Sequence, residues 1–474
     1  MSVAMPPAAS LLATGAGAGR AAVLLSALQP PAPRRAPVVR KELLDRLLDD
    51  VSAKLVLVVA PAGWGKTSLL RDWRACGEAP GTAWLSADPA DNDPARFWTG
   101  VVAALRTVCP GAGADALEAF RALKAPGENA ADVALPSLIN DLAEAGGRVA
   151  LVIDDFHLIT SEEVKRGFAF LVDHLPVTLG LVVATRCDPD LPLARMRARG
   201  ELAEFRADDL RFTEAETADL LNATLGLTVP PDDVHALQQR TEGWAAGLYL
   251  AGLSLRGRGD VSKHIAEITG ESRQIVDYFA AEVLAGLPAV VRAFLLRTSV
   301  LDGFCASLCD AVAGSAGSQE LLERLERAQM FLVPLDTTRQ WYRYHTLFAE
   351  WLRHELDRSE PGLAPQLHRR ASAWYREHGR ISEAVDHAIR AGDQPGRPDL
   401  PDRPDRPDLV EPLTSREREV LDLLAEGRPN RGIADELVVT VDTVKRHVSH
   451  ILAKLGAVNR TEAVARARER NLIS

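Results

Sequence analysis

The sequence has few cysteines and no long hydrophobic segment, and these two absences exclude several classes of protein. Its five cysteines are odd in number, scattered, and contain no CxxC pair. They therefore predict neither a disulfide framework nor a structural zinc site, and free thiols in a reducing cytoplasm are expected. No run of eighteen or more uncharged apolar residues occurs, so we expect no transmembrane helix and no membrane partner.

The chain also lacks an excess of positive charge. Its net charge is −10, which by itself argues against a nucleic-acid partner. The charge is uneven, however. Residues 411–474 hold eleven Lys and Arg against ten Asp and Glu, a net charge of +1, and residues 1–410 carry −11. With 474 residues the chain has room for about three domains, so a nucleic-acid-binding domain can be local to its C-terminal part.

A strand, a glycine loop and a helix follow one another in VLVVAPAGWGKTSLL. Gly63 and Gly65 allow a tight turn whose N–H groups face phosphate oxygens, and the helix N-terminus adds positive potential. Lys66 supplies a charge for the outer phosphates, and Thr67 a hydroxyl for Mg²⁺. The segment predicts a P-loop, although Ala60 stands where the usual pattern has Gly. The alternative is a loop that only links a strand to a helix.

Two adjacent carboxylates follow a second apolar strand, in RVALVIDD. Asp154 at the strand end is expected beside Thr67, where it can hold Mg²⁺ directly or through water. Asp155 can orient or deprotonate an attacking water. The next apolar strand ends before Arg186, which can reach a γ-phosphate. The alternative is a strand that ends in two surface acids.

Short apolar strands alternate with helical patterns up to about residue 212. This alternation predicts an α/β P-loop NTPase fold with a parallel sheet covered on both faces. From Thr213 onward, i, i+3, i+4 apolar spacing predicts successive helices. Residues 321–333 suggest a helix with a small hairpin, as in a winged helix, and residues 363–391 predict two helices that resemble the first unit of a helical repeat.

The last sixty residues predict short helices joined by tight turns, which is the pattern of a helix-turn-helix. In the third helix, the apolar positions 444, 448, 451 and 455 are expected to face the core. Lys445, Arg446 and Ser449 lie on the opposite face, where a recognition helix contacts base edges in the major groove. The alternative is a helical protein-interaction module.

The motifs in order, VVAPAGWGKTSLL, LVIDDFHLI, LVVATRCDPD, ADDLRFTEAE, TEGWAAGLYL and YRYHTLFAEWLR, resemble the MalT-type large regulators of the LuxR superfamily, which carry a STAND-class ATPase. The resemblance implies that Arg186 is a sensor arginine and that a helical lid and a winged helix follow the ATPase. It implies that His345 touches a nucleotide phosphate, although Thr346 replaces the usual Asp. A core or helix-capping role for His345 stays open. Arg40 and Ser68 complete the expected nucleotide contacts.

The C-terminal sequence LTSREREVLDLLAEG…VDTVKRHVSHILAKLG resembles the LuxR-type DNA-binding domain, an all-α helix-turn-helix. The resemblance implies that Lys445, Arg446 and Ser449 contact bases or backbone, with Thr443 and His447 near phosphates. Asn430, which is expected to cap the short helix predicted over 431–437, completes the set of predicted DNA-binding residues.

Seven segments are predicted along the chain. They are a disordered tail (1–36), a P-loop NTPase domain (37–212), a helical lid (213–285), a winged helix (286–362), a remnant of a helical-repeat region (363–391), a Pro/Asp/Arg linker (392–412) and a LuxR-type domain (413–474). The repeated PDRPD tract cannot form helix or sheet, and it reads as an extended spacer. It stands where MalT-type regulators carry a long repeat sensor.

These features predict a cytoplasmic, ATP- and Mg²⁺-dependent transcriptional regulator, an activator, that is at most a slow regulatory ATPase. Expected partners are promoter DNA, RNA polymerase, an unknown inducer and, in the ATP-bound state, further copies of the chain. Two alternatives stay open. One is an NTPase or assembly switch with incidental DNA binding, and the other is a constitutive DNA-binding regulator that has lost its sensor.

Overall fold

The computed structural model describes residues 23–32, 38–122, 134–144, 147–256, 261–284, 287–393, 415–425, 428, 432–433, 444, 447–448, 451–452, 460–469 and 472. The chain divides into two compact units. The first consists of Met1–Ala306 and Gly317–Glu355, and the second of Ser307–Ala316 and Leu356–Ser474. Among the described residues, no helix has the length and apolar character needed to span a bilayer.

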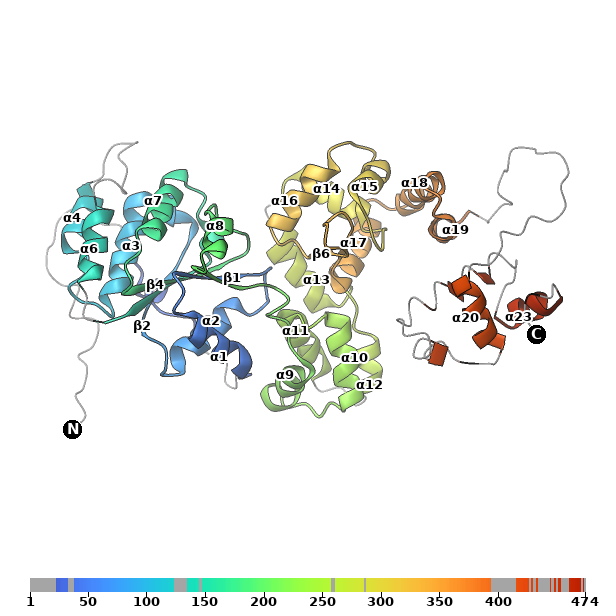
Figure 1. The fold of residues 1–474 in the computed structure, drawn as a ribbon, viewed down its shortest axis with the longest axis horizontal. Coiled ribbons are helices and arrows are strands. Elements are labelled where there is room, and N and C mark those ends of the chain that lie inside the picture. The colour runs from blue at the N-terminus through green and yellow to red at the C-terminus, as the bar shows by residue number, and fades with distance from the viewer. Residues whose placement is uncertain are drawn as a thin grey trace. The chain divides into compact units, whose positions relative to one another are not determined.

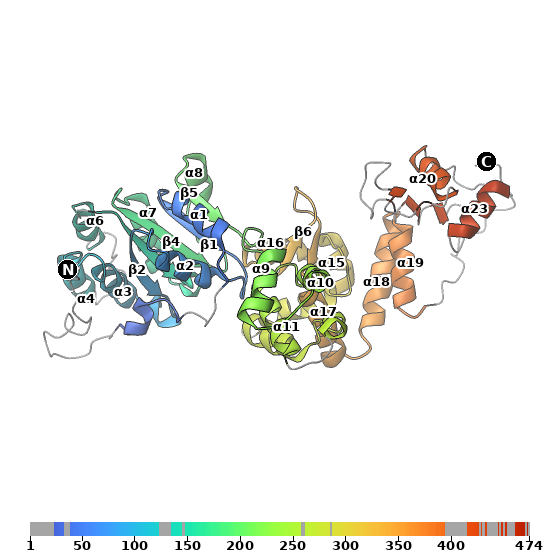
Figure 2. The ribbon, with the colours of Figure 1, turned by 90° about the horizontal axis from the view of Figure 1, so that it is seen from below.

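A five-stranded, all-parallel sheet in the order β2-β3-β4-β1-β5 forms the centre of the N-terminal part of the first unit (Figures 1 and 2). Its strands are β1 (Leu55–Val59), β2 (Gly81–Ser86), β3 (Val149–Asp154), β4 (Leu179–Thr185) and β5 (Leu202–Phe205). All residues of β1, β3 and β4 are buried. This confirms the expected parallel sheet with both faces covered, because only covered strands can be apolar throughout.

Helices cover both faces of this sheet. They are α1 (Lys41–Asp50), α2 (Lys66–Ala75), α3 (Pro94–Arg106), α4 (Ala114–Ala122), α6 (Leu135–Ala143), α7 (Glu162–Asp173) and α8 (Leu193–Ala198), with 3₁₀ turns η2 (Leu25–Leu28), η3 (Pro89–Asn92) and η4 (Phe156–Leu158). In Figure 1, α1 and α2 lie on one face and α3 and α7 on the other. Strand β5 and helices α4, α6 and α8 have no counterpart in the sequence-based expectation.

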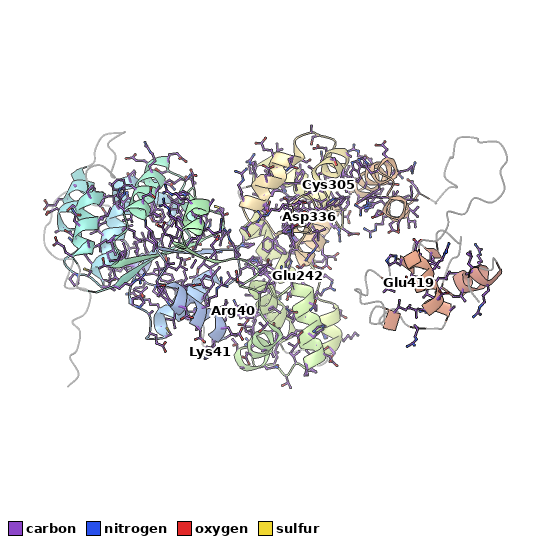
Figure 3. The ribbon with its side chains drawn as sticks, viewed as in Figure 1. Arg40, Lys41, Glu242, Cys305, Asp336 and Glu419 are labelled. Carbon is purple, nitrogen blue, oxygen red and sulfur yellow. The ribbon has the colours of Figure 1, made fainter. Side chains whose placement is uncertain are left out.

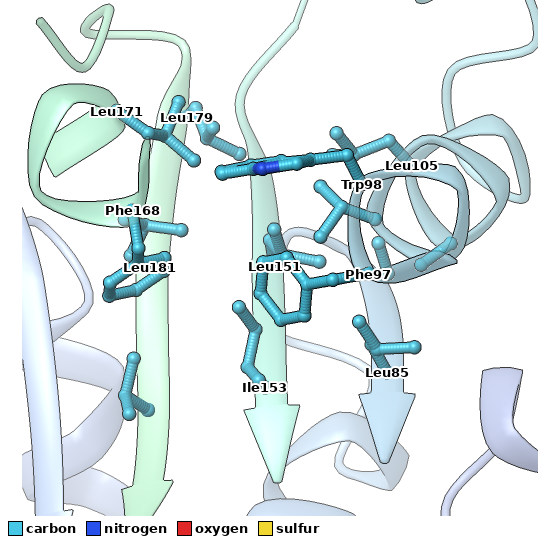
Figure 4. Close-up of a cluster of buried hydrophobic side chains, with 14 of the residues drawn as sticks. Leu85, Phe97, Trp98, Leu105, Leu151, Ile153, Phe168, Leu171, Leu179 and Leu181 are labelled. Carbon is cyan, nitrogen blue, oxygen red and sulfur yellow. The ribbon is translucent and has the colours of Figure 1, made fainter. Parts of the chain in front are cut away.

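The main core lies between the sheet and the helices α3, α6 and α7, and Figure 4 shows the part of it between the strands, α3 and α7. Trp98 of α3 is fully buried and stacks on Phe120, with ring centroids 5.7 Å apart. Gly167 of α7 lies against the same indole, and a Cβ at this position would be 2.9 Å from it. A small residue is therefore required where α7 crosses α3. This packing fixes β3 and β4, whose carboxyl ends carry the predicted site residues.

A helical region follows the sheet in the same unit. It contains α9 (Glu214–Ala218), the π-helical turn η5 (Asp219–Thr224), α10 (Pro231–Thr241), α11 (Ala245–Leu255), α12 (Val261–Ala266), α13 (Arg273–Phe279) and a second π-helical turn, η6 (Ala280–Leu284). We call this region the lid. A capping box between Thr213 and Glu216 starts α9, so a local sequence signal marks the change from sheet to helices.

The next elements are α14 (Ala289–Thr298), α15 (Ala306–Ala313), α16 (Ser318–Arg327), β6 (Leu332–Pro334), β7 (Tyr342–Tyr344) and α17 (Thr346–Ser359). Strands β6 and β7 pair antiparallel, which agrees with the small hairpin expected for a winged helix.

In the second unit, α18 (Ala364–Glu377) and α19 (Ile381–Arg390) lie side by side (Figure 2), as the sequence predicted. The C-terminal described helices are α20 (Ser415–Ala425) and α23 (Arg460–Glu469). Val420, Leu421, Ile433, Val444 and Ile451 form a common core with α23, and Val448 packs against it. The expectation that positions 444, 448 and 451 face inward is therefore confirmed, whereas residue 455 lies outside the described residues.

Candidate functional site

The loop between β1 and α2 has the backbone geometry of a phosphate-binding loop. Gly63 and Gly65 both adopt left-handed conformations, with φ of +78° and +84°, which residues with a Cβ rarely adopt. Gly65 is the N-cap of α2. The helix therefore begins at Lys66 with its unpaired N–H groups, and its positive dipole end, directed toward the loop.

The Lys66 ammonium is buried inside this loop. The side chain is 7% exposed, and Nζ donates to the carbonyls of Ala60 and Pro61 at 2.8 and 3.0 Å. Burial, followed by the positive charge of Arg186, lowers the pKa of Lys66 to about 8, against the opposing effect of Asp155 and Asp154. Lys66 is thus still mainly charged at neutral pH, and phosphate oxygens would replace the carbonyls as its partners.

Asp154 ends β3 and lies at the same edge of the sheet as the loop. It is 2% exposed. Burial, and then the charge of Asp155, raise the pKa of Asp154 to about 6, while a hydrogen bond from Thr67 opposes the shift. A desolvated carboxylate beside a hydroxyl suits a hard divalent cation, which would stabilise its ionised form. Among the described residues, no group of three or more His, Cys, Asp or Glu is arranged so that it could hold a metal ion, so Mg²⁺ here would take its remaining ligands from phosphates and water.

Asp155 has a left-handed backbone, with φ of +56°, which is uncommon for a residue other than Gly. Its N–H donates to the Asp154 carboxylate at 3.0 Å, and its side chain lines the loop cavity described below. His157 lies nearby, with Nδ1 3.8 Å from Asp155 Oδ1. Burial, then Arg186 and Lys66, lower the pKa of His157 to about 4, so the imidazole beside Asp155 is neutral at physiological pH.

A cavity of about 390 Å³ opens between the loop and the lid. The part near the sheet is polar and is lined by Gly63, Gly65, Lys66, Thr67, Ser68, Arg71, Asp72, Asp155 and Arg186. The remaining lining residues are Val38, Arg40, Phe212, Leu220, Thr224 and Ala245, together with Ala246 and Tyr278 of the lid, which lie close to Gly63 of the loop. The cavity therefore joins a phosphate-type cradle to a more apolar end, which is the arrangement that a nucleotide requires.

Arg40, labelled in Figure 3, also lines the cavity, and protein groups hold its guanidinium. It contacts both oxygens of Glu216 at 3.1 Å, and donates to the carbonyls of Leu210 and Arg211 at 2.9 and 2.7 Å. It also lies 4.6 Å from the centre of the Phe212 ring. Arg40 thus ties the segment before α1 to the beginning of the lid, and its predicted contact with nucleotide stays a prediction.

His345 is 1% exposed and does not belong to the residues that line the cavity. Its Nε2 lies 2.9 Å from the carbonyl oxygen of Thr241. Burial lowers the pKa of His345 to about 4, although Glu242 opposes this. Its ring centroid is 6.4 Å from that of Trp64, with the rings perpendicular. His345 therefore contacts the phosphate loop through the aromatic residue of that loop, and its contact with a phosphate stays a prediction.

Glu242 joins the lid to the winged helix (Figure 3). The side chain is 8% exposed. Its two oxygens accept from Arg343 at 2.8 Å each, and Oε1 also accepts from the N–H and the hydroxyl of Thr346 at 2.8 Å. The resemblance noted from the sequence led us to expect an acid at position 346, where the chain has Thr. Here a lid carboxylate lies against Thr346, so the acidic group beside His345 comes from another part of the chain.

The lid also contacts the backbone of the phosphate loop. The indole Nε1 of Trp244 donates to the Ala62 carbonyl at 3.1 Å, and the N–H of Ala246 donates to the Gly63 carbonyl at 2.9 Å. In the sequence, the stretch that contains Phe212 is marked by a family resemblance, and the stretch that contains Trp244 by the same resemblance and by a helical pattern. Their spacing from the P-loop gives no signal that they close the same cavity.

The predicted DNA contacts fall almost wholly outside the described residues. Asn430, Thr443, Lys445, Arg446 and Ser449 are among those that the structure does not describe. His447 is described, on a helical segment, and is half-buried. The roles of all six residues stay predictions.

Comparison with known proteins gives the same domain series. A family model described as AAA ATPase domain matches residues 36–184, the MalT winged helix domain matches 280–364, and the model for bacterial regulatory proteins of the luxR family matches 411–467. The HTH-type transcriptional regulator MalT of Yersinia enterocolitica is 33% identical over 371 residues, 78% of this chain. The chain is MalT-like. Its P-loop and ATPase domain imply a nucleotide with Mg²⁺, and its luxR-family domain implies DNA as a partner.

The serine/threonine-protein kinase PknK of Mycobacterium tuberculosis is 37% identical to the MalT-like chain over 367 residues, 77% of this chain. The chain spans 33% of the length of PknK and 40% of that of MalT. Among solved structures, the Walker-type ATPase PABY2304 of Pyrococcus abyssi matches with a TM-score of 0.46 and 16% identity, covering 68% of this chain and 97% of that one.

Proposed function

We propose that this chain is an ATP-dependent, DNA-binding transcriptional regulator, an activator, whose nucleotide state controls self-association and promoter binding. The observation that carries the proposal is the presence, in one chain, of a phosphate-loop cavity closed by a lid and a luxR-family domain. A nucleotide site that only supplied catalysis would need no DNA-binding domain, and a simple DNA-binding protein would need no buried Lys66 and Asp154. A cytoplasmic location and contact with RNA polymerase belong to this proposal.

ATP is the nucleotide we propose, with Mg²⁺. When bound, the nucleotide would supply a γ-phosphate as the group whose presence or loss distinguishes two states. Lys66 and the loop N–H groups would bind the phosphates, and Thr67 and Asp154 would hold Mg²⁺. Asp155 would orient or deprotonate a water, since it lines the cavity and its backbone is fixed by its neighbour. Val38, Phe212 and Leu220 would cover the base. Turnover would be slow, as in a switch that resets.

In the C-terminal domain, we propose that Lys445, Arg446 and Ser449 read base edges, while Asn430, Thr443 and His447 contact the backbone. The inward positions 444, 448 and 451 support this, because helical spacing would direct positions 445, 446 and 449 away from that core. A single module covers little surface, so association of several chains would raise the apparent affinity for repeated sites without any new base contact.

The test is promoter occupancy and DNA binding by the full chain with ATP and Mg²⁺, with ADP, and without nucleotide. Arg446→Ala should weaken binding at a cognate site by about 1–3 kcal/mol and relax base preference there. Arg416→Ala, if that residue contacts phosphate alone, should weaken all sequences alike. If the DNA affinity were the same with ATP, with ADP and without nucleotide, the result would instead support a constitutive regulator. Rapid ATP turnover with no effect on DNA binding would support an NTPase in which DNA binding is incidental.

A further inference from the structure

Arg186 follows β4 at the edge of the sheet where the phosphate loop lies, and it lines the cavity. Its guanidinium is already engaged by the lid. Nη2 lies 3.0 Å from Glu282 Oε2, and Nη1 donates to the Glu282 carbonyl at 3.3 Å. The side chains of Arg186 and Glu282 are 34% and 45% exposed, so this pair is accessible to a competing ligand.

Glu282 is held in place by a well-packed arm of the lid, α13 and the π-helical turn η6. Phe279 at the end of α13 is fully buried and stacks on Trp244, with centroids 5.1 Å apart and an interplanar angle of 13°. Tyr278 packs edge-on against the same indole at 5.3 Å. Trp244 also donates to the carbonyl of Ala62 in the phosphate loop. The same tryptophan therefore contacts both the phosphate loop and the arm that carries Glu282. Glu282 lies within the π-helical turn, a local feature that often occurs at functional sites, and here it is opposite Arg186.

A carboxylate and a terminal phosphate are both anionic acceptors for one guanidinium, and they repel each other when brought to the same place. A nucleoside diphosphate leaves the γ-phosphate position empty and therefore does not compete with Glu282 for Arg186. We propose that Glu282 is the residue by which this site discriminates nucleoside triphosphate from diphosphate, because a triphosphate must displace Glu282 from Arg186. This inference rests on the proposed nucleotide-switch function.

Displacement of Glu282 has a structural consequence. The arm loses its contact with the sheet edge at Glu282, while its aromatic residues Tyr278 and Phe279 still contact Trp244. By linkage, any change that releases the arm favours triphosphate to the same extent that triphosphate favours release of the arm. Glu282 is therefore a specificity-determining residue that sets the ratio of the two nucleotide affinities, because it lowers the affinity for triphosphate and does not affect that for diphosphate.

The experiment is calorimetric titration of the full chain, with Mg²⁺, by ADP and by a non-hydrolysable ATP analogue. Glu282→Gln should raise the affinity for the analogue about two- to fivefold, the range expected when an exposed ion pair no longer competes, and leave the affinity for ADP unchanged. Asp277→Asn removes a carboxylate from the same arm, one that pairs loosely with Arg273 at 3.9 Å, and it should change neither affinity. In an Arg186→Ala background, Glu282→Gln should have no further effect.

An unchanged ratio of affinities in Glu282→Gln, or an equal shift for both nucleotides, overturns the inference while the proposed function stands. A shift that persists in the Arg186→Ala background also overturns it, because Glu282 would then act through another group. If the wild-type chain binds neither nucleotide, the proposed function and this inference fail together. Melting curves of all variants identify any loss of folding, and the exposed position of Glu282 makes the Gln substitution a mild one.

Discussion

The two ends of the nucleotide cavity are built in different ways. The phosphate end comes from one contiguous loop and from the residues at the ends of two parallel strands, which the sheet brings together by its register. The other end combines Val38 with Phe212 and Leu220, which come from separate parts of the sequence and meet only because the lid folds back on the loop. The residues that would bind phosphates and Mg²⁺ are thus concentrated at one end of the cavity, and residues from the lid and from the segment before α1 form the other.

The largest effect is expected at the phosphate end, with Lys66→Ala. It removes the buried charge that faces the outer phosphates, and it should abolish binding of ATP and ADP while the fold stays intact. The measurement is calorimetric titration, with far-UV circular dichroism as a check on folding. Lys263→Ala, at an exposed position of the lid, is the matched control and should bind as wild type. Unchanged ATP affinity in Lys66→Ala would mean that this end of the cavity does not bind phosphates.

The next effect separates turnover from binding within the same end. Asp155→Asn should slow hydrolysis roughly a hundred- to ten-thousand-fold, the usual contribution of a positioned base, and change ATP affinity little. Single-turnover hydrolysis and equilibrium titration measure the two quantities. Asp154→Asn should instead weaken the Mg²⁺ dependence of binding, because its carboxylate is the proposed metal ligand. An equal loss of binding and turnover in Asp155→Asn would mean that the two roles are assigned wrongly.

A third prediction concerns the lid, where Glu242 holds Arg343 and Thr346. Burial raises the pKa of Glu242, but the Arg343 hydrogen bond, His345 and Thr346 outweigh it and bring the pKa well below 4.5. Because the folded-state pKa is depressed, the resulting stability is present above pH 4.5 and is lost as the pH falls below it. Glu242→Gln should destabilise the first unit by about 2 kcal/mol at pH 7.

Urea denaturation followed by intrinsic tryptophan fluorescence gives this difference, and it should shrink as the solution is acidified below the ordinary carboxyl pKa. Glu271→Gln, at an exposed lid position, is the control and should show no comparable loss. A difference between wild type and Glu242→Gln that stayed constant down to strongly acidic pH would contradict the assigned role of the charge.

The smallest effect is expected at the apolar end. Val38→Ala trims a half-buried side chain that lines the cavity, and a lost apolar contact of this size is worth about 1 kcal/mol. ATP and ADP should therefore bind several-fold more weakly, and by the same factor, since both carry the same base. Val39→Ala, at a 68% exposed neighbour, should bind normally. A change in the ATP-to-ADP ratio would show that the two ends are not independent.

The same contrast explains what the sequence could predict. Loop, strand and helix are local patterns, so the residues 60–68, Asp154, Asp155 and the parallel sheet follow from spacing and periodicity. Tyr278 and Glu282 could not be predicted, because nothing near them marks a contact with Ala62, Gly63 or Arg186. The edge strand β5 was missed because it is short and only partly buried, with no apolar run of its own. The helix that carries Trp244 was expected, but its contact with the loop depends on tertiary packing.

Gly63 shows how far this packing restricts the chain. A Cβ at this position would lie 2.5 Å from the Ala246 side chain, 2.6 Å from the Tyr278 hydroxyl and 2.9 Å from Trp244 Nε1. The left-handed backbone alone would already favour glycine here. The crowding adds a second and separate reason, one that comes from partners about 180 to 215 residues further along the chain. Exchange of either domain for that of a distant relative should therefore succeed only when loop and lid are transplanted as a pair.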